Sequence, residues 1–127
     1  MDASGELYPT IPVVALARAV AFYRDKLGLS VVSDEMPGIA LLTNAAGNKV
    51  MLFERPPSVA DHALAAFVVD DIEAEVDALT AVDVIFEQYE LGPGLVTDER
   101  GILSMGPAKA AWFRDSEGNL LSIHNRL

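Results

Sequence analysis

The chain has 127 residues, of which 51% are hydrophobic and 22% are charged, a balance typical of a globular protein. Its formal net charge is −10, and it lacks the clustered lysines and arginines with which proteins bind the phosphates of nucleic acids. It has no cysteine, which excludes disulfides, thiolate metal ligands and a thiol nucleophile.

Residues 1–6 are predicted to form a flexible amino-terminal tail. They lack the basic and apolar segments of a signal peptide, and the chain has no apolar run long enough to span a membrane. We therefore expect a cytoplasmic protein whose partners are neither nucleic acid nor membrane.

The first half of the chain has the pattern of a β-α-β-β-β module. Residues 7–14 predict a strand, and the apolar residues from Leu16 to Leu27 then recur at helical spacing. Gly28 follows as a residue that can end the helix in the left-handed conformation. Three further strands are predicted at residues 29–33, 39–43 and 49–54.

Residues 55–61, which contain two adjacent prolines, predict a linker, after which the same plan begins again. A strand is expected at residues 62–69, followed by a helix that starts at Ile72. The carboxylates of Asp70 and Asp71 suit the start of this helix. No glycine follows the helix, so Asp83 is the candidate for the left-handed residue at its end.

The rest of the second half predicts a strand at residues 84–87, a long loop at 91–101 and a weak strand at 102–105. Long loops are often functional, with disorder as the alternative. A hairpin completes the chain, because two β-rich runs flank the turn of residues 115–119. In this turn Asp115 can cap the backbone and Gly118 can adopt a positive φ.

Two pairs of similar segments indicate that the chain repeats one module. Residues 47–53 correspond to residues 118–124, which lie 71 positions later, and residues 11–16 correspond to 67–72, which lie 56 positions later. An internal repeat of this kind decides the architecture before individual elements do.

Three segments in this order carry a resemblance to a known family: residues 21–29, residues 67–71 and residues 112–119. Together they closely resemble the glyoxalase, bleomycin-resistance and extradiol-dioxygenase superfamily, also called vicinal oxygen chelate (VOC) proteins. The resemblance spans residues 7–126. It implies an α+β fold in which two βαβββ modules form a curved mixed sheet around a concave cleft, within a protein that forms a homodimer.

The implied organisation is a single domain over residues 7–127. Its first module comprises residues 7–54, its linker residues 55–61 and its second module residues 62–127.

The resemblance also implies where metal-dependent members of the superfamily would hold their ion. The four ligand positions fall on Tyr8, Met51, Leu64 and Ser122, and none of these is a usual ligand of the family. We therefore expect no metal at these positions and no cofactor. A slip of one residue would bring in Glu54 or His62, but it would also turn the rest of the strand to its other face.

His62 and His124 each lie two residues from one of these positions, and residues two apart on a strand share a face. If the two strands run parallel, the histidines lie in opposite directions along the sheet, which makes a shared ion awkward. Three roles stay open for them: hydrogen-bonded or solvent-facing residues, ligand contact or acid–base work, and metal binding.

The expected cleft is apolar and aromatic with a few polar groups, which suits a small organic ligand. The alternative is that its residues only fill the core. Tyr8 and His124 are the candidate catalytic residues. The candidate ligand-binding residues are Tyr8, Met51, Phe53, His62, Leu64, Trp112, Ser122 and His124.

The leading prediction is a metal-independent pocket that binds a small organic molecule, either to sequester it or to act on it by acid–base catalysis. Two alternatives are a metal-dependent lyase, isomerase or dioxygenase with a relocated metal, and a non-catalytic protein whose role is association. The superfamily hosts several chemistries on one scaffold, so the resemblance does not decide whether the chain is an enzyme.

Overall fold

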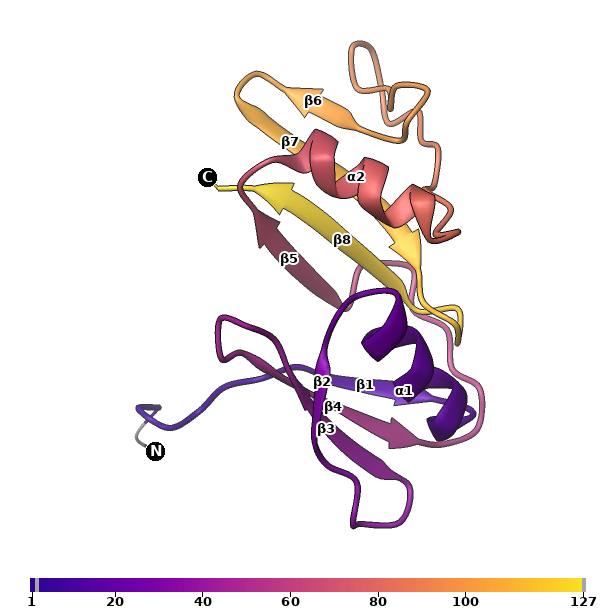
Figure 1. The fold of residues 1–127 in the computed structure, drawn as a ribbon. Helices are drawn as coiled ribbons and strands as arrows, with labels where there is room; N and C mark the ends of the chain where they lie inside the picture. Colours follow the sequence, from indigo (N-terminus) through magenta and orange to yellow (C-terminus); the bar gives the residue numbers. More distant parts are fainter. Residues whose placement is uncertain (2, 127) are drawn as a thin grey trace. The chain divides into compact units, whose positions relative to one another are not determined.

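The structure, a computed structural model, describes Met1 and residues 3–126. The chain divides into two compact units, Met1–Ser58 (unit 1) and Val59–Leu127 (unit 2). Each unit has one helix and one four-stranded mixed sheet, in the order β-α-β-β-β (Figure 1). The predicted α+β class with two βαβββ modules is therefore confirmed.

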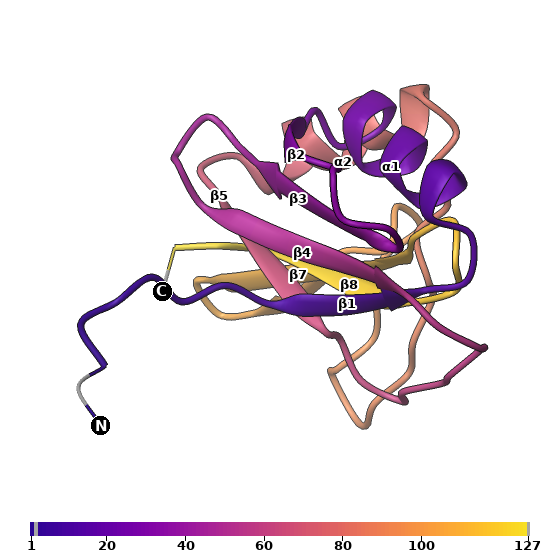
Figure 2. The ribbon, with the colours of Figure 1, turned by 90° about the horizontal axis from the view of Figure 1, so that it is seen from below.

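Unit 1 has the strand order β1-β4-β3-β2, in which β1 is parallel to β4 and the other pairs are antiparallel. The helix lies over one side of this sheet (Figure 2). The elements are β1 (Thr10–Val13), α1 (Leu16–Asp25), β2 (Ser30–Ser33), β3 (Ile39–Thr43) and β4 (Lys49–Glu54).

The predicted bounds of β3 and β4 are confirmed, whereas β1 begins three residues later than predicted. Pro9 contributes only its carbonyl to the sheet, which accepts from the Met51 N–H at 3.0 Å. Proline has no N–H to donate, so the regular ladder starts only after it.

The end of α1 follows the predicted chemistry. Gly28 adopts a φ of 77°, and its N–H donates to the Arg24 carbonyl at 3.1 Å, as in the αL capping motif. Ala19 and Tyr23 are the buried residues of the helix, so its apolar stripe faces its own unit.

Unit 2 has the strand order β5-β8-β7-β6, with β5 parallel to β8 and the other pairs antiparallel. Its helix is capped as predicted, because the Asp71 carboxylate accepts from the Ala74 N–H at 3.1 Å and Asp83 adopts a φ of 69°. The elements are β5 (Ala65–Val69), α2 (Ile72–Ala81), β6 (Leu103–Met105), β7 (Ala108–Arg114) and β8 (Leu120–Asn125).

In unit 2, one predicted strand is absent and another begins later than predicted. Residues 84–87 form no strand, because β6 pairs with the first half of β7 and this segment meets β7 only through the single bridge between Phe86 and Phe113. The predicted strand 62–69 begins only at Ala65, since residues 61 and 62 lie in a bend. The long loop predicted at residues 91–101 is confirmed as a segment without helix or strand.

The two hairpin turns confirm the predicted repeat. Asp115 accepts through its side chain from the Asn119 N–H at 2.8 Å, and its N–H donates to the Asn119 carbonyl at 2.9 Å. In unit 1, Asn44 makes the same two hydrogen bonds with Asn48, at 3.0 and 3.1 Å. Gly118 adopts a φ of 85°, as its turn requires.

Candidate functional site

In unit 1, one face of the sheet packs on α1 and the other does not. Glu54 of β4 accepts a hydrogen bond from the Leu16 N–H at the start of α1, and the alternate residues of β4 on the same side are buried. Met51 and Phe53 point the other way and are half-buried. The residues aligned on that side, which we call the Met51 face, are Thr10, Pro12, Met51, Phe53, Ile39 and Leu41.

Tyr8 lies just before β1 and is half-buried. Its neighbour Pro9 is held against β4 by the hydrogen bond from the Met51 N–H. Met51 and Phe53 therefore lie on one face of the sheet, and Tyr8 lies on the segment that leads into β1.

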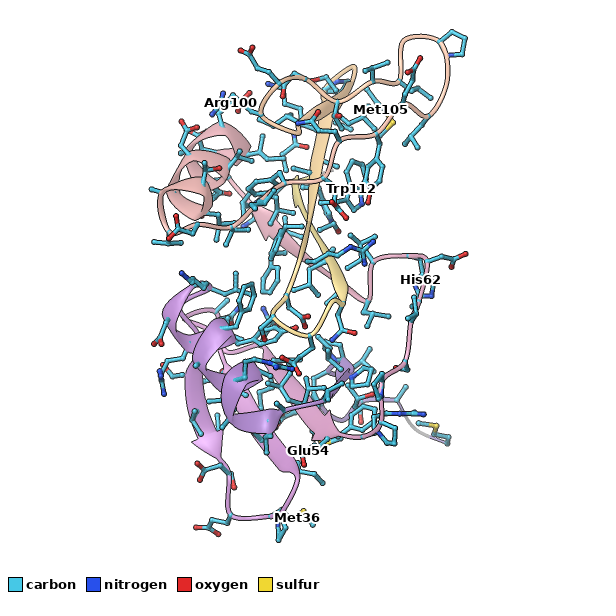
Figure 3. The ribbon with its side chains drawn as sticks, turned by 90° about the vertical axis from the view of Figure 1, so that its right-hand side faces the viewer. Met36, Glu54, His62, Arg100, Met105 and Trp112 are labelled. Carbon is cyan, nitrogen blue, oxygen red and sulfur yellow. The ribbon has the colours of Figure 1, made fainter. Side chains whose placement is uncertain are left out.

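In unit 2, Lys109 of β7 reaches Glu73 of α2 at 2.6 Å, so this residue and its alternates on β7 face the helix. Trp112 points to the opposite side of the strand, as Figure 3 shows, and is half-buried. Strand register aligns six residues on that side, which we call the Trp112 face: Ala66, Val68, Ser122, His124, Ala110 and Trp112.

Exposure varies across the Trp112 face. Val68 at its edge is 50% exposed, whereas Ser122 is 7% exposed. Leu64 lies just before β5, is half-buried, and donates its N–H to the Leu120 carbonyl at 2.9 Å. The structure thus places Leu64, Trp112, Ser122 and His124 on or beside one mostly apolar face.

Strand register confirms the correspondence between the two halves. Thr10 pairs with Met51 in unit 1, and Ala66 pairs with Ser122 in unit 2, which are the positions expected from offsets of 56 and 71. The offsets of the sequence repeat therefore hold in the strand pairing of the two units.

The residues at the four metal-ligand positions that the family resemblance implies do not fit a divalent metal centre. Tyr8, Met51, Leu64 and Ser122 supply a phenol, a thioether, a hydrocarbon and a hydroxyl, where iron, nickel, zinc or manganese needs imidazoles and carboxylates. Within Met1 and residues 3–126, no three histidine, aspartate or glutamate side chains come together as a metal-binding group.

Glu54 and His62, the residues that a register slip would bring in, are both placed elsewhere. Glu54 lies on the α1 side of β4, and the pairing of β4 with β3 and β1 is regular throughout. His62 is exposed, and its Nδ1 lies 3.1 Å from the Ala63 carbonyl. Figure 3 shows His62 on the segment that leads to β5. The prediction that His62 shares a strand face with Leu64 is therefore wrong.

His124 is the better-placed histidine, because it lies within the Trp112 face between Val68 and Ala110. Its Nδ1 lies 2.8 Å from the Asn125 carbonyl. With the ring proton on Nδ1, this contact leaves Nε2 to accept a proton. His124 on β8 pairs with Val68 near the end of β5, whereas His62 precedes the start of β5, so the two histidines lie in opposite directions along this parallel strand pair.

Sequence reasoning missed Tyr89, which contacts Trp112. The two rings meet edge to face, with centroids 5.5 Å apart and an interplanar angle of 75°. Thr97, only 7% exposed, holds Tyr89: its Oγ1 accepts from the Tyr89 N–H at 2.9 Å, and its own N–H donates to the Tyr89 carbonyl at 3.0 Å. The only sequence signal was an aromatic residue beside a long loop.

A charged pair lies next to these rings. Arg114 binds Glu87 through Nε at 2.8 Å and donates from Nη1 to the Gly118 carbonyl at 2.9 Å. Burial raises the pKa of Tyr89, the charge of Glu87 raises it further, and Arg114 opposes both. Tyr89 is therefore a neutral hydrogen-bond donor at physiological pH.

The two units share one architecture, a βαβββ order with a four-stranded mixed sheet that has its helix on one face only. The chain belongs to the Glyoxalase/Bleomycin resistance protein/Dioxygenase superfamily, whose family model matches residues 7–123.

Solved structures share the fold over nearly the whole chain. UcmS2 is 22% identical, with 98% of each chain covered and a TM-score of 0.73. TnmS3, an antibiotic-binding protein from Streptomyces sp. CB03234, is 20% identical, with 100% of this chain and 99% of that one covered and a TM-score of 0.72. The fosfomycin resistance protein FosX from Listeria monocytogenes is 16% identical, with 99% and 94% covered and a TM-score of 0.70.

At these identities the likeness concerns the fold alone. No curated protein matches the sequence significantly. Among the described residues, no helix is long and apolar enough to cross a membrane.

Proposed function

We propose that this protein binds a small, largely apolar or aromatic organic molecule without using the family's metal positions. The Trp112 face of unit 2 is the principal binding surface. The candidate ligand-binding residues within unit 2 are His62, Leu64, Trp112, Ser122 and His124, and those within unit 1 are Tyr8, Met51 and Phe53.

One observation carries the proposal: the positions equivalent to metal ligands hold groups that bind organic molecules better than ions. The Trp112 face combines an indole, small aliphatic side chains, a hydroxyl and an imidazole, which is the mixture typical of small-molecule sites. A relative with the same fold, TnmS3, is named as an antibiotic-binding protein. This supports the same broad use of the scaffold here.

Binding alone would sequester the ligand. If the protein also acts on it, His124 is the proposed proton-transfer group, with Nε2 as the reacting atom, and Tyr8 is the second candidate. We further propose that the protein acts as a homodimer, as the resemblance implies.

The first experiment is elemental analysis of protein purified without an affinity tag, together with thermal unfolding in the presence of divalent ions. We expect no stoichiometric metal and no large increase in Tm. A bound metal, or strong stabilisation by one ion, would contradict the proposal, because a ligand that binds only the folded state raises its stability.

The second experiment is a screen of neutral, cationic and anionic aromatic compounds, read by the fluorescence of Trp112, the only tryptophan in the chain. Compounds that change the emission are then measured by ligand-observed NMR on Trp112→Leu. We expect this variant to bind about tenfold more weakly, since it loses the aromatic surface. Phe22→Leu on α1 is the matched control and should bind the ligand as tightly as the unmodified protein. A screen in which no compound binds would contradict the proposed function.

A further inference from the structure

Unit 2 carries nearly all of the excess negative charge of the protein. Thirteen of the nineteen acidic residues lie in unit 2, against four of the nine basic residues, so its formal net charge is −9. Each of the four basic side chains makes an ion pair with a carboxylate of the same unit: Arg100 with Asp77, Lys109 with Glu73, Arg114 with Glu87, and Arg126 with Asp70.

Near Trp112, too, the basic side chain is paired with a carboxylate. Arg114 is two residues beyond Trp112 on the same side of β7, and it is held by both Glu87 and the Gly118 carbonyl. Burial is the main cause of the raised pKa of Tyr89, and the charge of Glu87 raises this pKa by more than Arg114 lowers it. The carboxylate of Glu87 therefore offsets the nearby guanidinium of Arg114, with which it forms an ion pair.

The faces of aromatic rings also favour positive charge, because the ring quadrupole attracts a cation placed over them. Tyr89 and Trp112 meet edge to face at an interplanar angle of 75° and are both half-buried, so they present two differently oriented ring surfaces. Aromatic contact and electrostatic field thus select the same kind of molecule.

We infer that Tyr89 and Trp112 together form a subsite for an organic cation, an ammonium group attached to an aromatic or alkyl body, in preference to a carboxylate or phosphate of the same shape. The inference rests on the proposed function, because it specifies the charge of the ligand bound on the Trp112 face. It also adds Tyr89 to the binding residues.

The test compares benzyltrimethylammonium, benzyl alcohol and phenylacetate as probes on the full chain, by Trp112 fluorescence and ligand-observed NMR. We expect the cation to bind about tenfold more tightly than phenylacetate at low salt. The preference should shrink severalfold at 0.3 M NaCl, at which charges are screened within about 6 Å.

Four variants locate the effect. Tyr89→Leu should weaken binding of the cation severalfold, and Tyr89→Phe should restore it, because the ring rather than the hydroxyl makes the contact. Glu87→Gln leaves Arg114 without its carboxylate, so it should lower the affinity for the cation and raise that for phenylacetate. Glu75→Gln, an exposed residue of α2 on the opposite side of the sheet, removes the same charge and should change neither.

The outcomes separate this inference from the proposed function. Equal or tighter binding of phenylacetate would overturn the cation subsite, as would binding of neutral compounds only, and both results would leave the proposed function standing. An equal response of Glu87→Gln and Glu75→Gln would also overturn it, because the preference would then come from net charge and not from the ring pair.

Discussion

Gly101 is buried where the loop between α2 and β6 returns to the sheet. Its φ is +89°, and an added Cβ would lie 2.7 Å from the Phe86 Cβ and 3.2 Å from the Glu87 carbonyl oxygen. Both the backbone conformation and the contact exclude a side chain. The residues it touches lead directly to Tyr89, so this glycine also supports the candidate binding surface.

We expect Gly101→Ala to lower the free energy of unfolding by about 2–4 kcal/mol, through strain at positive φ and displacement of Phe86. Denaturant unfolding followed by Trp112 fluorescence measures this loss. Gly94→Ala is the control, since Gly94 has a φ of +75° with nothing within 4 Å of an added Cβ. It should cost only about 1 kcal/mol, and equal losses would show that the contact with Phe86 does not matter.

The two hairpin turns use one hydrogen-bonding scheme with different burial. Asp115 is 6% exposed and accepts from the N–H groups of Glu117 and Asn119 and from the Asn119 side chain. Its counterpart Asn44 lies in the turn of unit 1 and accepts from the Asn48 N–H. A buried acceptor of several bonds leaves more donors unsatisfied when it is removed.

Asp115→Ala should therefore destabilise the protein by about 2–3 kcal/mol and Asn44→Ala by about 1 kcal/mol or less. Thermal or urea unfolding of the two variants, compared with the unmodified chain, gives both values. If Asn44→Ala proved the more damaging change, burial would not be the factor that distinguishes the turns.

The Lys109–Glu73 pair, which ties β7 to α2, should make stability depend on acid. The hydrogen bond from Lys109 is the main cause that lowers the pKa of Glu73 below its ordinary value of 4.5. A carboxyl whose pKa is lowered on folding stabilises the protein above its unfolded pKa and loses this contribution as the pH falls through its folded pKa.

Glu73→Gln should thus be less stable than the unmodified protein at pH 7, and the difference should vanish at a pH below the folded pKa of Glu73. Unfolding curves at a series of pH values test this. A difference that stayed constant with pH would mean that packing, and not the charge of Glu73, is responsible.

For the molecule as a whole, the dominant electrostatic feature is the net charge of −9 on unit 2. Like charges repel within a folded unit, and this repulsion is screened by salt. The ion pairs of unit 2 lie at the surface and contribute about 0–1 kcal/mol each, so their loss in salt is a smaller effect.

We expect the unfolding temperature to rise as NaCl increases from about 0.02 to 0.2 M, over which the screening length falls from roughly 20 to 7 Å. Calorimetry or thermal denaturation by circular dichroism measures this. A falling Tm would show that the ion pairs outweigh the net repulsion.

Much of the fold followed from local sequence patterns. Apolar alternation located β3 and β4, Asp71 and Asp83 marked the two ends of α2, and the turn at Asp115 predicted the last hairpin. These signals depend on residues a few positions apart, for which propensity and hydrogen bonding act within the segment itself.

Local sequence patterns predicted only part of the candidate site. The register of the repeat predicted that Trp112, Ser122 and His124 share a sheet, because a strand alternates its faces regularly. It could not predict that Tyr89 contacts Trp112, 23 residues further along the chain, since a loop carries no period.

The sequence by itself thus determined the repeated βαβββ plan and its turns and caps. The tertiary structure decided the use of Glu54 to cap α1, the loss of a strand at residues 84–87 and the aromatic pair of Tyr89 with Trp112. The physical reason is that these features depend on which distant segments meet across a sheet edge or a helix end, and such meetings are set by packing rather than by neighbouring residues.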